Sequence, residues 1–411
     1  MAAKKILFIS YDGMTDPLGQ SQVIPYLQGL SKHGHKIFLL SCEKEHVFLQ
    51  NKATIENLVS AFDITWVPIK YTKKPPVLST LLDILKLRRE AKKIHKKYKL
   101  DMVHTRPGVP ALVGLWMKQK FGIKFLNDIR EFYADSRVEG NMWNLKNPLF
   151  KTVYNFFKKK EVAAVALSDG IVCLTYAAEK IINTWPEYNK NIPLQVIPCS
   201  ADLQLFDATQ ITKVQQQKLK EALHIGVNDF IVSYLGSIGG WYLTEEMMQF
   251  CKVLSDKMPA AKFLFISPHR HDEIIAAAAK QRIAADKIVI KKAGRKEVPL
   301  LLSLSQCSVF FIKPCYSKQS SSPTKHGEIM AMGIPLITNS GVGDVEKIVH
   351  QYHAGIVIDQ FNQSEYLNAA DKIAAGVQFN SAEIRRGAEE FYSLEQAIEK
   401  YNQIYNSILL H

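Results

Sequence analysis

The sequence predicts an α/β protein built from two Rossmann-like domains that face each other across a cleft. A chain of 411 residues is too long for one ordinary core and suits two large domains. Apolar runs typical of strands alternate with amphipathic stretches typical of helices, and this alternation predicts parallel sheets with helices on both faces. A polar stretch over residues 201–223 interrupts the alternation, so we place a domain boundary between Ala201 and Thr212.

Strand candidates follow one another regularly through the first half. The first covers residues 4–10, a helix is expected from about Gln20 to Lys32, and a long basic helix is expected within residues 70–99. The other strand candidates are residues 36–42, 64–69, 101–105, 124–129, 170–175 and 194–200.

The same rhythm restarts after the polar stretch. Strand candidates there are residues 230–236, 262–267, 287–293, 307–313, 335–338 and 355–359. We therefore expect domains over residues 1–200 and 201–390, followed by a C-terminal helix over 391–411 that could pack back on the first domain.

Composition and missing motifs narrow the functional classes. Hydrophobic residues make up 47% and charged residues 22% of the chain, as in folded globular proteins. The six cysteines are scattered without zinc-site spacing, which favours reduced thiols and a cytoplasmic location. The dinucleotide-binding, P-loop, hydrolase and zinc-protease motifs are absent, and no Asp-x-Asp pattern for a divalent metal occurs.

Residues 317–344 carry the most specific pattern. A strand leads into a helix that begins near Thr324, so Ser321, Ser322, Thr324 and the amides around them lie at a helix N-terminus, which favours anions. Lys325 adds a full positive charge and predicts a pyrophosphate site. The alternative is an ordinary capped helix. One turn later, Glu328 could accept two hydrogen bonds from a ribose, or could be a solvated helix residue.

The stretch SPTKHGEIMAMGIPLI, residues 322–337, resembles the second domain of the group 1 glycosyltransferases, those of family four and its relatives. The resemblance implies the GT-B fold, a nucleotide-sugar donor and a ribose contact from Glu328. The first glutamate of the family's pair would fall at Ser320, so the chain departs from the pattern there.

The resemblance extends over most of the chain. It places Gly19 and Gly236 in two glycine-containing loops near the donor, and His104 and Arg106 at a strand end on the acceptor side. In the family, the second glycine loop usually carries an Arg or Lys that contacts the diphosphate. Residues 236–246 of this chain contain neither. Lys325, Arg270 or Lys313 must then supply the charge on the diphosphate, and we favour Lys325.

Strand position puts Asp128 where the family has a histidine beside the donor sugar. Its carboxylate could bind the sugar or take a proton from the acceptor hydroxyl; the alternative is a loop cap. The charged residues after it, which include Arg130 on the acceptor side, predict a mobile loop over residues 130–139 that covers the acceptor.

The positive charge is concentrated in the first half. Residues 1–200 contain 30 Lys and Arg against 17 Asp and Glu, whereas residues 201–411 are neutral. Within residues 70–99, a leucine stripe is expected to cover the sheet while the basic face meets an anionic partner. Without a nucleic-acid module we expect a membrane rather than DNA or RNA, reached through Lys92, Lys93, Lys96, Lys97 and Lys158–Lys160.

These patterns together predict a glycosyltransferase that moves a sugar from a nucleotide diphosphate to an acceptor hydroxyl. The resemblance implies a retaining reaction without metal or other cofactor, catalytic roles for Asp128 and Lys325, and a lipid-linked or saccharide acceptor in cell-surface polysaccharide synthesis. The expected location is the cytoplasm, including the inner face of the membrane. Two alternatives stay open: a nucleotide-sugar 2-epimerase, and a non-catalytic nucleotide-binding protein.

Overall fold

The computed structural model describes residues 3–410, which form two compact units. Of these residues, the first unit comprises 3–198 together with 394–410, and the second comprises 199–393. The chain passes from the first unit to the second after residue 198 and returns to the first unit at residue 394, so the C-terminal helix belongs to the first unit.

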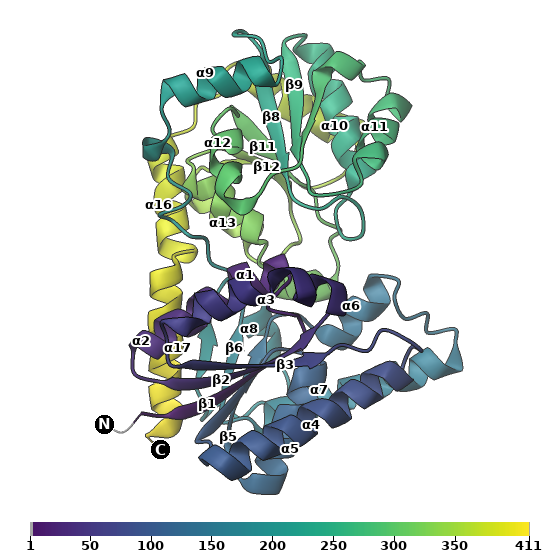
Figure 1. Ribbon diagram of the computed structural model, residues 1–411. Coiled ribbons are helices and arrows are strands. Elements are labelled where there is room, and N and C mark those ends of the chain that lie inside the picture. The colour runs from purple at the N-terminus through teal and green to yellow at the C-terminus, as the bar shows by residue number, and fades with distance from the viewer. Residues whose placement is uncertain (1–2, 411) are drawn as a thin grey trace. The chain divides into compact units, whose positions relative to one another are not determined.

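The first unit is built on one parallel sheet, which has seven strands within the described residues (Figure 1). Their order is β3-β2-β1-β4-β5-β6-β7, and each strand runs parallel to its neighbours. The strands are β1 (Lys5–Ser10), β2 (Lys36–Glu43), β3 (Ile64–Lys70), β4 (Met102–Thr105), β5 (Lys124–Ile129), β6 (Gly170–Cys173) and β7 (Leu194–Val196). The central strands are near-continuous apolar runs, because helices cover both faces of the sheet.

Two groups of helices cover these faces. The helices of the unit are α1 (Pro17–Gln22), α2 (Ile24–Lys32), α3 (Glu45–Ser60), α4 (Leu78–Tyr98), α5 (Val109–Phe121), α6 (Tyr133–Glu139), α7 (Pro148–Leu167), α8 (Tyr176–Ile182) and α17 (Leu394–Leu409). Helices α2, α3 and α17 share one hydrophobic core, and α4, α5 and α7 share another. Helix α17 buries Tyr401, Ile404, Tyr405 and Ile408, so it completes the first of these cores.

The expected leucine stripe does not cover the sheet. Helix α4 buries Ile84, Leu87, Ala91 and Ile94, whereas the leucines at 78, 81, 82 and 85 are exposed. The apolar residues of α4 lie on two opposite faces of the helix, one buried and one exposed. The predicted stripe was wrong because it combined residues from both faces.

The second unit repeats the architecture with a six-stranded parallel sheet in the described chain, in the order β10-β9-β8-β11-β12-β13 (Figure 1). The strands are β8 (Phe230–Leu235), β9 (Ala261–Ile266), β10 (Ile288–Lys291), β11 (Cys307–Val309), β12 (Leu336–Asn339) and β13 (Gly355–Ile358). The α-helices are α9 (Lys213–Ala222), α10 (Thr244–Lys257), α11 (His271–Lys280), α12 (Val298–Leu302), α13 (Thr324–Ala331), α14 (Val345–Gln351), α15 (Gln363–Ala374) and α16 (Ser381–Phe391). Short 3-10 helices are η1 (Ala208–Gln210), η2 (Ala285–Lys287), η3 (Arg295–Glu297) and η4 (Tyr316–Ser320).

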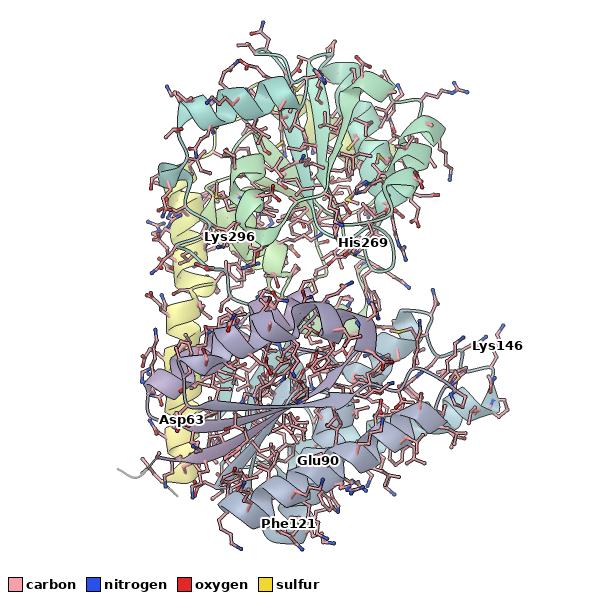
Figure 2. All side chains as sticks on the ribbon, in the orientation of Figure 1. Asp63, Glu90, Phe121, Lys146, His269 and Lys296 are labelled. Atoms are coloured by element: carbon pink, nitrogen blue, oxygen red, sulfur yellow. The ribbon has the colours of Figure 1, made fainter. Side chains whose placement is uncertain are left out.

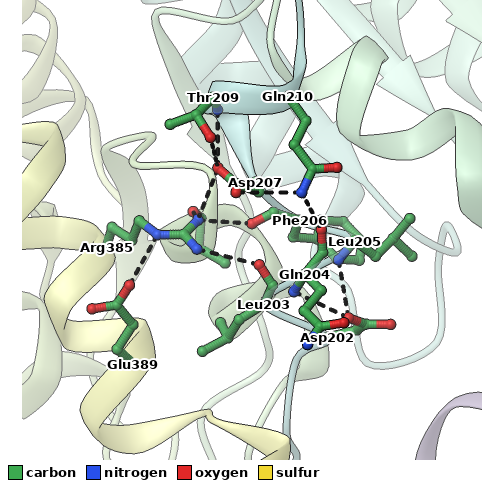
Figure 3. Close-up of polar contacts among 11 residues, drawn as sticks. Asp202, Leu203, Gln204, Leu205, Phe206, Asp207, Thr209, Gln210, Arg385 and Glu389 are labelled. Atoms are coloured by element: carbon green, nitrogen blue, oxygen red, sulfur yellow. Dashed lines mark hydrogen bonds and ion pairs between the residues drawn. The ribbon is translucent and has the colours of Figure 1, made fainter.

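One arginine of α16 fastens the polar segment at the start of the second unit. The Arg385 guanidinium donates to the carbonyl oxygens of Leu203 at 3.2 Å, Phe206 at 3.0 Å and Ala331 at 2.6 Å (Figure 3). Its Nε also donates to Glu389 at 3.0 Å. These bonds satisfy carbonyls that no regular secondary structure pairs, so the segment is ordered without a strand of its own.

Candidate functional site

Lys325 lies in the first turn of α13, in a buried and aromatic environment. Its side chain is 7% exposed, and its Nζ lies 3.2 Å from the Tyr234 hydroxyl. The Nζ also lies over the Tyr242 ring at 3.8 Å from the centroid and over the Tyr234 ring at 4.4 Å. Because Tyr234 donates its own proton to the carbonyl of Ser237, its oxygen accepts from Lys325.

No carboxylate among the described residues forms an ion pair with Lys325. Burial without such a partner lowers the pKa of Lys325 to about 7, an effect that the charge of Glu328 partly opposes. The aromatic rings stabilise the ammonium through their faces but supply no full negative charge. An anion that reached this nitrogen would therefore provide its missing counter-charge.

Glycine is required directly beside Lys325. The loop after β8 contains Gly236 with φ 119°, and a Cβ there would lie 2.8 Å from the Lys325 Nζ. Gly239, with φ 74°, meets the guanidinium of Arg270, which donates to the carbonyl of Ile238 at 3.3 Å. The structure therefore brings Gly236 to Lys325 and Arg270 to the same loop.

The start of α13 supplies backbone amides rather than a side-chain cap. Its N-cap is Pro323, and no side chain caps the helix. Of the predicted hydroxyl residues, Ser322 accepts from the amide of Cys199 at 3.2 Å, and Ser321 and Thr324 are partly exposed beside it. Ser320 is fully buried and donates to the carbonyl of Ser317 at 2.8 Å, so no carboxylate stands where the family has its first glutamate.

Glu328 is paired with an arginine that the sequence did not single out. Its Oε1 accepts from Arg295 Nη1 at 2.8 Å, and the guanidinium of Arg295 lies 5.4 Å from the centre of the Phe206 ring. Burial raises the pKa of Glu328 above its usual range, although Arg295 and Lys325 oppose that rise. This pair leaves the second carboxylate oxygen for other hydrogen bonds.

In the first unit, Asp128 ends β5 inside a buried polar network. Its Oδ2 accepts from Tyr401 at 2.8 Å, and His104 Nε2 and Arg130 Nη1 lie 3.3 and 3.5 Å away. His104 Nδ1 lies 2.7 Å from the hydroxyl of Tyr405. Burial acts to raise the pKa of Asp128, but Arg130 and His104 outweigh it and hold the pKa below its usual value.

Asp128 also lines a small cavity. Its Oδ1 is buried without a hydrogen-bond partner among the described residues, and the cavity of about 10 Å³ is also lined by Gln22, Arg106 and Tyr401 among others. That volume suits one water molecule. The predicted acceptor-side residues His104, Arg106 and Arg130 thus gather around Asp128, but all of them are buried.

The N-terminal glycine loop is held by a buried carboxylate. Glu43 accepts from the amides of Met14 and Thr15 at 2.8 and 3.2 Å, and from the hydroxyl of Thr15 at 2.6 Å. A Cβ on Gly19 would lie 2.4 Å from the carbonyl oxygen of Gly13. Close packing of this loop on itself therefore requires glycine at position 19, whether or not a ligand approaches.

The expected mobile loop after β5 is wrong for residues 133–139, which form α6. Ala134 donates its amide to Glu161 at 3.1 Å, and Asp135 accepts from Tyr154 and Lys158 of α7 at 2.9 and 2.8 Å. Asp135 is one of the acidic residues that suggested a solvated loop, but its carboxylate instead accepts hydrogen bonds from α7.

Comparisons with known proteins agree with this architecture. Residues 215–385 match the family described as glycosyl transferases group 1. This chain carries a group 1 glycosyltransferase domain. The resemblance seen in the sequence is thereby confirmed, and with it the assignment of a glycosyltransferase. No curated protein matches the chain significantly in sequence.

Solved structures give the fold of the whole glycosyltransferase. A sucrose-phosphate synthase from Thermosynechococcus elongatus superimposes with a TM-score of 0.74 at 14% identity, covering 99% of both chains. A glycosyltransferase from Rickettsia africae superimposes with a TM-score of 0.71 at 17% identity, and the match covers 99% of both chains. The Anabaena protein Alr3699/HepE, solved with UDP and glucose, gives 0.69 at 12% identity and covers 98% of this chain and 100% of its own. The expected GT-B fold is confirmed.

The sequence of this glycosyltransferase did not predict the aromatic rings around Lys325 or the pairing of Arg295 with Glu328. Trp241 and Tyr242 directly follow the glycine loop, and Lys318 Nζ lies 3.7 Å from the centre of the Trp241 ring. Two adjacent aromatic residues after a glycine loop were the available signal. Arg295 offered none, because its partner Glu328 is distant in sequence and pairs with it only in the folded unit.

Proposed function

We propose that this glycosyltransferase transfers a sugar from a nucleotide diphosphate to an acceptor hydroxyl, and that its second unit binds the donor. The observation that carries the proposal is Lys325, a buried amine at the start of α13, beside Gly236, that forms no ion pair with a carboxylate in the part of the chain that the structure describes. A diphosphate there would pair with Lys325 and with the amides of the helix N-terminus. Glu328 would bind the ribose through its unpaired oxygen.

The proposed reaction retains configuration and uses no metal. In a front-side route the leaving phosphate takes the acceptor's proton, while Lys325 and the helix amides stabilise the charge that develops on it. The route needs no enzymatic nucleophile, which suits a chain with Ser320 at the first glutamate position. Asp128 is the candidate that orients or deprotonates the acceptor; its burial favours orientation through Tyr401 and Arg130.

The proposed donor is a uridine diphosphate sugar. Support comes from Alr3699/HepE, a protein of the same fold that was solved with UDP and with UDP-glucose. The proposed acceptor is a lipid-linked or other saccharide of cell-surface polysaccharide synthesis, reached from the cytoplasmic face of a membrane. The excess of basic residues over residues 1–200 supports an anionic surface as the partner of the first unit. Among residues 3–410 no helix is long and apolar enough to span a bilayer.

Calorimetry with UDP-glucose tests the donor site. The wild type is expected to bind, and Lys325→Met is expected to bind more weakly by about 1.5 to 3 kcal/mol, the range for a charge-assisted contact. Arg386→Met, a change at an exposed position of α16, is the control and should bind as the wild type does. Equal affinity of Lys325→Met and wild type would contradict the assignment.

Product analysis separates the three candidate activities. A transferase releases UDP and a glycosylated acceptor only when an acceptor is supplied. An epimerase changes the sugar of the donor alone, and a non-catalytic protein binds UDP-glucose without changing it.

A further inference from the structure

Helix α4 exposes four leucines on two successive turns. Leu78, Leu81, Leu82 and Leu85 are 59, 51, 50 and 53% exposed, and we call these four residues the leucine face. Residues three and four apart share one side of a helix, so the four side chains form one continuous strip. The opposite side of α4 packs into the core, which means that the leucines do not serve the fold of the first unit.

The same side of α4 becomes basic in its second half. Arg89, Lys92 and Lys96 continue the spacing of the leucine face, and we call them the basic face. None of the three forms an ion pair with a carboxylate among the described residues. Lys93, by contrast, pairs with Glu90 (Figure 2) at 2.7 Å. The charge available on this side therefore belongs to the basic face.

Helix α7 repeats the combination at a smaller scale. Leu149 and Phe156 are 54 and 46% exposed, and Lys159 is exposed one turn after Phe156. Lys158 pairs with Asp135 at 2.8 Å and with Glu161 at 3.3 Å, so its charge is already compensated. Helices α4, α5 and α7 share one core and cover one face of the sheet, so both apolar strips belong to that layer.

Exposed apolar strips bordered by cations are typical of surfaces that lie in a bilayer interface. Leucine side chains transfer from water to the acyl boundary, and lysine and arginine attract the anionic headgroups beside them. A protein partner would need an apolar surface of matching shape and acidic groups opposite the basic face. An anionic bilayer supplies an apolar layer and negative charge without any specific shape.

We propose that the leucine face of α4 inserts into the interface of an anionic membrane while its basic face contacts the headgroups. This proposal deepens the proposed function, on which its biological purpose rests, but its physical claim concerns α4 alone. It keeps Lys92 and Lys96, which the sequence suggested, as contacts with the headgroups, and adds the preceding leucines as the inserted surface.

Sedimentation with lipid vesicles tests the proposal on the full chain. Vesicles are phosphatidylcholine with or without phosphatidylglycerol, and no donor or acceptor is added. The variant L81S/L82S should bind anionic vesicles about tenfold or more weakly than the wild type, because two half-exposed leucines can no longer leave water. The variant R89Q/K92Q/K96Q should lose the preference for anionic over neutral vesicles.

The matched control changes two exposed leucines elsewhere in the first unit. Leu49 and Leu58 on α3 are 76 and 37% exposed, and α3 packs in the other core of the unit. L49S/L58S should bind vesicles as the wild type does. All variants should unfold at the wild-type temperature, because the changed side chains are exposed or, for Lys92, partly exposed.

Several results would overturn the proposal: no binding of the wild type to anionic vesicles, equal loss in both leucine variants, or no loss in L81S/L82S. A wild type that dimerises in sedimentation equilibrium and becomes monomeric as L81S/L82S would instead make the leucine face a contact between copies. Binding of UDP-glucose by L81S/L82S is measured in parallel, so failure of membrane docking and failure of donor binding are distinguished.

Discussion

Donor binding should draw a proton onto Lys325. Burial without a carboxylate partner places the pKa of Lys325 at about 7 before a donor arrives. A bound diphosphate would supply the missing negative charge and raise that pKa toward the ordinary value for lysine, about 10.4. Binding at neutral pH then requires protonation of the neutral fraction of the side chain.

The size of the effect follows from the free pKa. At pH 7 about half of the molecules already carry the proton, so binding takes up about half a proton; at pH 8 it takes up about nine-tenths. Affinity should therefore fall about fivefold between pH 7 and pH 8, or about 1 kcal/mol, and should change little below pH 6. Affinity falls as the pH rises because Lys325 is a base whose pKa is higher in the complex than in the free protein.

Groups facing Lys325 do not produce the same pH dependence. Burial raises the pKa values of Tyr234 and Tyr242 above 10, so both stay neutral in this range. Glu328 faces it from one turn along α13, and Arg295 from η3 is paired with that carboxylate. Burial raises the pKa of Glu328 above its usual range, but Glu328 is unchanged in the variant Lys325→Arg, so any titration of this carboxyl would appear in the variant as well as in the wild type.

Calorimetry with UDP-glucose in phosphate and in Tris buffer measures the uptake, because the apparent enthalpy then depends on the heat of buffer ionisation. UDP-glucose is the suitable probe because its phosphates lack the second ionisation near pH 6 that a terminal phosphate has. Lys325→Arg keeps a permanent charge and should show almost no uptake. Binding of UDP-glucose to the wild type with identical enthalpies in both buffers would refute the reasoning; absence of binding would instead count against the donor site.

Three further predictions concern single side chains. Glu328→Gln should weaken UDP-glucose binding about tenfold in calorimetry, because an amide is a poorer acceptor for ribose hydroxyls than a carboxylate; unchanged affinity would contradict the ribose contact. Asp128→Asn should lower turnover while the dissociation constant of UDP-glucose stays near wild type, and undiminished turnover would leave Asp128 with a structural role only. Arg385→Met should lower the free energy of unfolding of the second unit by about 2 to 4 kcal/mol in denaturant titration, since several buried carbonyls lose their donor. Arg386→Met, at a more exposed neighbour, should change it by less than about 0.5 kcal/mol.

The fold could be predicted because its signals are local. Apolar runs such as residues 36–42 specify buried parallel strands by themselves, and the polar stretch after residue 200 marks the change of unit. Helix α6 was missed because Asp135, which suggested a solvated loop, is satisfied by Tyr154 and Lys158 of α7.

The site could be predicted only in part for the same reason. Lys325 and Gly236 follow from a helix start and a loop after a strand, and the structure brings them together. The aromatic rings of Tyr234 and Tyr242 reach Lys325 from β8 and the loop after it, which are distant in sequence from α13, and Arg295 reaches Glu328 from η3. Such pairings depend on tertiary folding, and neither periodicity nor spacing encodes them.

During synthesis the first unit is completed late, because it includes helix α17. The unit needs Tyr401, Tyr405 and their neighbours to close one of its cores, yet the ribosome makes this helix only after the whole second unit. At about 5–20 residues per second, roughly 10–40 s separate the two parts. During that interval the second unit, which is continuous in sequence, can fold to completion while the sheet of the first unit still exposes an apolar face. The synthesis of α17 therefore sets the earliest moment at which this apolar face can be covered.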